Sequence, residues 1–311
     1  MRILTALTAG TLLLAQDQLP TLKVDVDVVS ILASVRDKKN TLIPNLGKDD
    51  FTVLEDGKPQ TIKYFTKETD LPLTIGLLID VSRSQENLIE IERRAAAQFF
   101  SQVLRKKDIA FLISFGEECE LLQDYTGSVR LLTDGMNQLR VSGGVGGLHP
   151  GPVPTVSQPR GTVLFDAIYL AATEKLKGEV GRKVIVVITD GVDQGSRLNR
   201  NQAIEAAQKA DAVIYSIDYE DPRYHGMFGP SGEGDLKKMS DETGGHVYRV
   251  DRKNTLEQVF KELQDEMRSQ YSIGYTPSNN AKDGSYRHLE IRTGNKELKV
   301  QARKGYFAVK Q

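Results

Sequence analysis

Residues 73–84 read LTIGLLIDVSRS, and this stretch decides the fold. Its first part, Leu73 to Ile79, is an apolar run with the length and composition of a buried strand. The run ends in Asp80, and Ser82 and Ser84 follow at every second position. One short loop therefore offers a carboxylate and two hydroxyls, and hard cations such as Mg²⁺ prefer oxygen ligands. The stretch predicts a strand with a candidate cation site at its carboxyl end.

A second apolar run ends in a similar way. Val184 to Ile188 leads into Thr189-Asp190-Gly191. Between the two runs lies Gly161-Thr162, which opens a segment with helical periodicity from Val163 to Leu176. The chain therefore places a second carboxylate and a further hydroxyl where loops follow predicted strands or precede a predicted helix.

We expect Asp80 and Asp190 to face one crevice, because ligands in open parallel sheets bind beyond the carboxyl ends of strands, where the strand order reverses. Two neighbouring carboxylates repel each other unless a positive charge lies between them, and a divalent cation supplies that charge. Hydroxyls complete the shell without adding charge. The predicted metal ligands are Asp80, Ser82, Ser84, Thr162 and Asp190. An octahedral shell then keeps a position open for an Asp or Glu of a protein partner.

The order Asp-x-Ser-x-Ser, then a lone Thr, then an Asp resembles the metal-ion-dependent adhesion site of the von Willebrand factor A family. The surroundings are similar too, with Gly-Thr-x-Leu-Phe-Asp-Ala around Thr162 and Val-Ile-Thr-Asp-Gly around Asp190. The resemblance covers residues 71–268, and the flanks 49–57 and 304–306 look like those of exported bacterial members. Arg83 departs from the family pattern, in which this position is frequently small. That difference bears on affinity for an acidic partner and leaves the fold expectation intact.

The resemblance implies a doubly wound, mostly parallel, Rossmann-like sheet and a non-catalytic protein-binding or adhesion module. Mg²⁺ is the expected ion, with Mn²⁺ and Ca²⁺ as alternatives. The ion would capture an acidic residue of a protein partner. By analogy with the family, ligation would shift Thr162 and its loop and couple to the last helix.

The centre of the chain alternates apolar strands with amphipathic helices. The expected strands are residues 73–79, 109–115, 184–188 and 212–217. In the first helix, Leu88, Ile91, Ala95, Phe99 and Val103 recur at helical spacing. Apolar strands separated by helices imply a parallel α/β sheet covered on both faces.

Both ends of the chain have a β rhythm instead. Lys23 to Ser34 alternates, Phe51–Leu54 and Thr61–Phe65 flank an Asp-Gly turn that predicts a hairpin, and alternation returns after Ser269. We therefore expect a split β-sandwich of residues 20–70 and 269–309, with an α/β domain of residues 71–268 inserted into it. The alternative is that these strands extend the edge of the central sheet.

Composition limits the partners. The 311 residues carry 41 Lys+Arg against 42 Asp+Glu, a net charge of -1, which favours neither nucleic acid nor an anionic membrane. The single cysteine, Cys119, excludes an internal disulfide.

The first residues predict a signal peptide. Residues 1–15 combine Arg2 with an apolar run that is too short to span a bilayer. We therefore expect an exported protein of the periplasm or exterior, with no transmembrane segment after the signal peptide is removed.

An enzyme is the main alternative. A metal-dependent phosphatase or phosphotransfer protein could use Asp80 as nucleophile. Phosphatases of the haloacid-dehalogenase type need a second Asp two residues later, and here that residue is Ser82. Neither a Gly-x-Ser-x-Gly elbow nor a phosphate-binding Gly-Lys-Ser/Thr loop occurs in the sequence. A third hypothesis is a structural envelope protein whose site has lost its ligand.

Overall fold

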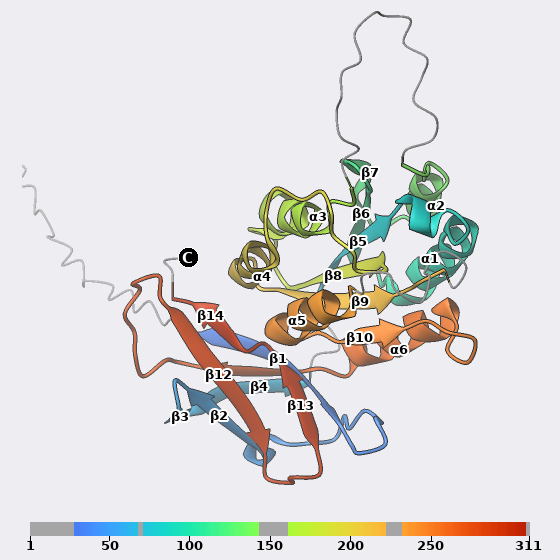
Figure 1. The fold of residues 1–311 in the computed structure, drawn as a ribbon. Coiled ribbons are helices and arrows are strands. Elements are labelled where there is room, and N and C mark those ends of the chain that lie inside the picture. Colours follow the sequence, from blue (N-terminus) through green and yellow to red (C-terminus); the bar gives the residue numbers. More distant parts are fainter. Residues whose placement is uncertain (1–27, 68–70, 143–160, 222–231, 309–311) are drawn as a thin grey trace, which may run out of the picture.

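A computed structural model describes residues 28–67, 71–142, 161–221 and 232–308. These residues form one six-stranded sheet and two four-stranded sheets. The six-stranded sheet lies with its helices on one side of the molecule, and the two smaller sheets lie together on the other (Figure 1). The predicted fold class, a mostly parallel α/β sheet combined with antiparallel sheets from both chain ends, is confirmed.

The central sheet has the strand order β10-β9-β8-β5-β6-β7. Its parallel strands are β5 (Leu73–Asp80), β6 (Ile109–Phe115), β8 (Arg182–Thr189), β9 (Ala212–Asp218) and β10 (Val247–Arg249). Strand β7 (Cys119–Thr126) closes one edge antiparallel to β6. All eight residues of β5 are buried, as expected of a strand with helices on both sides.

Helices cover both faces of this sheet (Figure 1). One face carries α1 (Ile89–Val103), α2 (Val129–Met136) and α6 (Leu256–Arg268). The other carries α3 (Leu164–Leu170), which continues as the π-helical turn η3 (Ala171–Leu176), α4 (Arg200–Lys209) and α5 (Glu233–Thr243). Short 3₁₀ turns η1 (Lys48–Asp50) and η2 (Arg83–Gln85) complete the helical elements. The sheet is therefore doubly wound.

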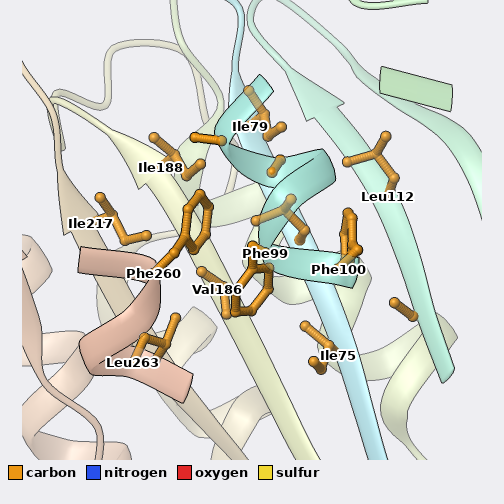
Figure 2. Close-up of a cluster of buried hydrophobic side chains, with 14 of the residues drawn as sticks. Ile75, Ile79, Phe99, Phe100, Leu112, Val186, Ile188, Ile217, Phe260 and Leu263 are labelled. Carbon is orange, nitrogen blue, oxygen red and sulfur yellow. The ribbon is translucent and has the colours of Figure 1, made fainter. Parts of the chain in front are cut away.

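The core on the α1 and α6 face is closed by aromatic stacking (Figure 2). Phe99 of α1 stacks on Phe260 of α6 with ring centroids 4.4 Å apart. The pair lies over Val186 and neighbouring aliphatic side chains of the sheet. This packing holds α1, the helix that follows the loop of Ser82 and Ser84, against the sheet and α6.

The two chain ends build a β-sandwich. One sheet has the order β13-β1-β11-β4 and the other β14-β12-β2-β3. Their bounds are β1 (Val29–Arg36), β2 (Phe51–Glu55), β3 (Lys58–Gln60), β4 (Ile62–Lys67), β11 (Tyr271–Tyr275), β12 (Tyr286–Thr293), β13 (Lys299–Ala302) and β14 (Gly305–Phe307). Side chains from both sheets share one apolar core. The strands therefore form their own layers and do not extend the central sheet.

The expected hairpin is wrong in its second strand. β2 pairs with the short β3, and the turn uses Asp56 and Gly57 at φ 48° and 78°. β4 crosses to the other sheet and pairs with β11. The part of the predicted strand that precedes Val28, and the predicted signal peptide, lie outside the described residues.

A buried polar cluster ties α6 to the sandwich. Glu266 of α6 has no solvent exposure and accepts hydrogen bonds from Ser34 Oγ at 2.9 Å, Arg36 Nη2 at 2.5 Å and Tyr248 Oη at 2.6 Å. Ser34 and Arg36 belong to β1. Because α6 leads directly into β11, this cluster anchors the last helix at the boundary between the two layers.

Glu266→Ala should lower the free energy of unfolding by about 3–5 kcal/mol, because it leaves the half-buried Arg36 without its carboxylate. Urea denaturation measures the change. Glu262→Ala, an exposed position on the same helix, is the control and should change stability by less than about 0.5 kcal/mol. Equal stability of the two variants would contradict the anchoring role.

Candidate metal centre

Asp80 and Asp190 are brought to the same end of the sheet by neighbouring strands. β5 and β8 run parallel with Ile79 opposite Ile188, so Asp80 ends one strand and Asp190 directly follows the other. The strand order reverses here, since β6 lies on one side of β5 and β8 on the other. Loops that leave β5 and β8 diverge at such a point and open a crevice.

Asp80 is held in a fixed orientation. It has no solvent exposure, its Oδ1 accepts from Ser82 N at 2.9 Å, and its Oδ2 accepts from Thr189 Oγ1 at 2.6 Å. The pKa of Asp80 is raised to about 7, mainly by burial and also by the charge of Asp190, against the lowering effect of the Thr189 hydrogen bond. The ionised form of Asp80 therefore lacks a compensating positive charge.

Ser82 and Ser84 present their hydroxyls together. Their Oγ atoms lie 3.0 Å apart, and both residues are partly exposed. Ser82 is the extended residue before η2, and this turn brings Ser84 back beside it. Arg83 between them is exposed to solvent. The loop thus combines a buried carboxylate with two hydroxyls nearer the surface.

Asp190 and Thr162 are joined through their loops. Asp190 is buried, and its Oδ1 accepts from Val192 N at 3.0 Å. The carbonyl of Thr162 accepts from Gln194 N at 3.1 Å and Gly195 N at 3.0 Å, which ties the residue to the loop that follows Asp190. Within the described parts of the chain, the Thr162 hydroxyl makes no hydrogen bond. The structure links Asp80, Ser82 and Ser84 directly, whereas Thr162 reaches this region through its backbone.

Two glycines allow the close approach of these loops. A Cβ on Gly195 would lie 2.2 Å from the Gly161 carbonyl oxygen, and a Cβ on Gly161 would lie 2.4 Å from Gln194 Cβ. Neither contact is possible for a larger residue without backbone movement. Gly161 and Gly195 therefore fix the place of Thr162 beside the Asp190 loop.

Two further carboxylates near the site are used by the surrounding loops. Asp193 Oδ2 accepts from Ser196 Oγ at 2.5 Å and from Phe165 N at 3.2 Å at the start of α3. Asp166 accepts from Arg197 N and Leu198 N, each at 3.0 Å. Both side chains hold the Asp190 loop against α3.

Glu92 is a buried acid that the sequence pattern does not single out. It lies in the first turn of α1 with no solvent exposure, and neither carboxylate oxygen has a hydrogen-bond partner among the described residues. Burial, and then the charge of Asp80, raise its pKa well above the ordinary value. A helix N-terminus offsets at most about 2 kcal/mol for an acid placed there. That is less than the several kcal/mol that burial of a carboxylate costs.

The donor types in this region fit a hard divalent cation. Two carboxylates supply negative charge and three hydroxyls supply neutral oxygen. In the described ranges no three His, Cys, Asp or Glu side chains gather as a metal cluster of their own. Any cation here would therefore depend on hydroxyl ligands as well as on Asp80 and Asp190.

Cys119, the single cysteine, is half-buried, and burial followed by the charge of Asp166 raises the pKa of its thiol to about 11. This keeps the thiol protonated and unreactive at neutral pH.

None of the helices in the described segments is both long and apolar enough to cross a membrane. A search of curated proteins finds no match to this chain.

Comparisons with solved structures give distant likenesses. Proximal thread matrix protein 1 from the mussel byssus, with a zinc-occupied MIDAS motif, has 12% identity and a TM-score of 0.50, covering 69% of this chain and 50% of that chain. An aerotolerance-related membrane protein from Bacteroides fragilis has 17% identity and a TM-score of 0.47, covering 63% and 98%. BatB from Bacteroides thetaiotaomicron has 17% identity and a TM-score of 0.45, covering 63% and 97%.

The family model of the von Willebrand factor type A domain matches residues 154–262. This range runs from the Thr162 loop through β8, the Asp190 loop and most of α6. Together with the doubly wound sheet, the match shows that this chain contains a von Willebrand factor type A domain.

Proposed function

We propose that the chain is a non-catalytic, divalent-metal-dependent protein-binding or adhesion module of the bacterial envelope or exterior. A cation, Mg²⁺ with Mn²⁺ or Ca²⁺ as alternatives, binds at Asp80, Ser82, Ser84, Thr162 and Asp190 and captures an Asp or Glu of a protein partner. Residues 71–268 form the binding domain. Residues 20–70 and 269–309 form the sandwich that carries it, after export directed by residues 1–15.

The observation that carries this proposal is the pair of buried carboxylates at the strand-order reversal. Asp80 and Asp190 end neighbouring strands, and the charge of one raises the pKa of the other. A divalent cation between them removes the repulsion and supplies a site for a third carboxylate, contributed by a partner. Domains of this family mediate protein–protein interaction, which agrees with this use of the site.

The residues have separate roles in this proposal. Asp80 and Asp190 bind the cation through charge, while Thr189 and the backbone N–H of Ser82 orient Asp80. Ser82 and Ser84 lie nearer the surface and provide neutral oxygens beside the open position. Arg83 is exposed next to them and adds a positive charge that an acidic partner meets first.

The geometry of Asp80 counts against the phosphatase alternative. Both of its oxygens accept hydrogen bonds and the residue has no solvent exposure, whereas a nucleophile must reach its substrate. Ser82 occupies the place of the general acid and has no useful acidity. A protein that hydrolyses p-nitrophenyl phosphate, with activity lost in Asp80→Asn, would support the enzyme instead.

Partner capture should require both the cation and Asp190. Immobilised protein incubated with envelope extract in Mg²⁺ should retain a partner that EDTA releases and that Asp190→Ala fails to retain. Asp134→Ala, an exposed carboxylate on α2, is the matched control and should retain the partner at the wild-type level. Proteins that stay bound after chelation and in the Asp190→Ala variant would argue against metal-bridged recognition.

Mg²⁺ affinity should fall as the pH falls below 7. The pKa of Asp80 is raised to about 7, so below that pH a proton must leave before the cation binds, and affinity weakens by up to about tenfold per pH unit. Isothermal titration calorimetry at pH 8, 7 and 6 measures this. Affinity that is equal at pH 8 and pH 6 would contradict it.

Two further measurements check the same group. Without metal, folded Asp80 holds its proton up to about pH 7, whereas the unfolded chain releases it near its ordinary pKa. Stability of the metal-free protein should therefore fall as the pH rises from about 4 to 7, and Mg²⁺ should restore it at pH 8.

Thr189→Val removes a hydrogen bond that lowers the pKa of Asp80, so it should move the loss of Mg²⁺ affinity to higher pH.

A further inference from the structure

The buried face of α1 carries one charged side chain. Its other buried members are apolar and pack on the sheet, among them Ala95, Phe99 and Val103. Glu92 lies on this face with no solvent exposure. Glu90 and Arg93 of the same turn pair with each other near the surface and leave Glu92 without a share in that ion pair.

Glu92 lies in the first turn of α1, the helix that follows the loop of Ser82 and Ser84. Burial raises the pKa of Glu92, and the charge of Asp80 raises it further. Burial also raises the pKa of the half-buried Tyr219, and the charge of Glu92 raises it further. Gln85 is also without exposure and donates from Nε2 to the Tyr219 carbonyl at 3.2 Å.

The polar atoms of this region are left unsatisfied by protein groups. Both Glu92 oxygens and Gln85 Oε1 have no hydrogen-bond partner within the residues that the structure describes. Such atoms occur rarely in folded proteins and mark the place of water or an ion. These acceptors need hydrogen-bond donors, and water bound to a cation directs its O–H donors away from the ion.

We propose that Glu92 is a positioning residue of the metal centre, which accepts a hydrogen bond from water that hydrates the cation at Asp80 and Asp190. This rests on the proposed metal site and adds a third carboxylate to it, outside the direct ligands. Mg²⁺ keeps several waters when protein binds it, and acceptors for those waters strengthen binding. When the cation is bound, its positive charge compensates the negative charge of the buried Glu92 carboxylate.

The test is Mg²⁺ binding by isothermal titration calorimetry at pH 8 in wild type, Glu92→Gln and Glu90→Gln. Glu92→Gln keeps the shape and removes the charge, and it should weaken Mg²⁺ binding about 10–100-fold. Glu90→Gln is the matched control because its side chain lies on the same turn, 77% exposed, and it should bind as wild type does. Glu92→Met, which keeps the length without any acceptor, should weaken binding as Glu92→Gln does.

A second readout separates this role from packing. Without metal, Glu92→Gln removes a buried acid that has no hydrogen-bond partner among the described residues, so its thermal midpoint in EDTA should equal or exceed that of wild type. The combination of weaker metal binding with undiminished metal-free stability supports the proposal. A lowered midpoint in EDTA in both variants would assign Glu92 to packing and overturn it.

The failures of the two proposals are distinguishable. Wild-type protein that binds Mg²⁺, with Glu92→Gln binding within about twofold of it, would overturn the role of Glu92 and leave the metal site standing. Wild-type protein that does not bind Mg²⁺ at all would overturn both.

Discussion

The repulsion between Asp80 and Asp190 is the constraint on which the functional interpretation depends. Parallel pairing of β5 with β8 fixes both carboxylates at one end of the sheet, and burial removes the water that would screen them. A fold that places two buried acids together in this way is stable as a charged state only when a cation is bound. The proposed cation site, with its hard oxygen ligands and its open position for an acidic partner, depends on this pair.

The surrounding loops are built to keep that pair in place. Gly161 and Gly195 approach too closely for any side chain, and the carbonyl of Thr162 accepts two backbone N–H groups from the loop after Asp190. Thr189, the last residue of β8, donates a hydrogen bond to Asp80 and so connects the two strand ends directly. Hydrogen bonds and close backbone packing therefore join the Thr162 loop to the Asp190 loop, and the end of β8 to Asp80.

The sequence predicts the central sheet well because buried parallel strands leave a strong signal. The runs at 73–79 and 109–115 match β5 and β6, and the periodicity from Leu88 to Val103 matches α1. Short or polar edge strands leave little signal, so β7 and the three-residue β10 were not foreseen. The Asp-Gly turn predicts a chain reversal but does not specify which residues pair after it. Only one residue separates β3 from β4. The sequence pattern therefore assigns β4 to the hairpin, although β3 is the strand that pairs with β2. Glu92 was missed because a charged residue in a helix is ordinarily read as exposed, while Ile91 beside it is only half-buried.

Two buried glutamates, Glu266 and Glu92, differ in whether the fold supplies hydrogen-bond donors for their carboxylates. Glu266 of α6 and Glu92 of α1 are equally buried, and their helices meet at Phe99 and Phe260. Glu266 accepts from three donors, so its burial is compensated within the fold and serves to join α6 to the sandwich. Glu92 has no donor among the described residues, so packing alone does not account for its presence. An apolar residue would fill the same space at lower cost, so an acid at this position agrees with the proposed role of accepting a hydrogen bond from water that hydrates the cation.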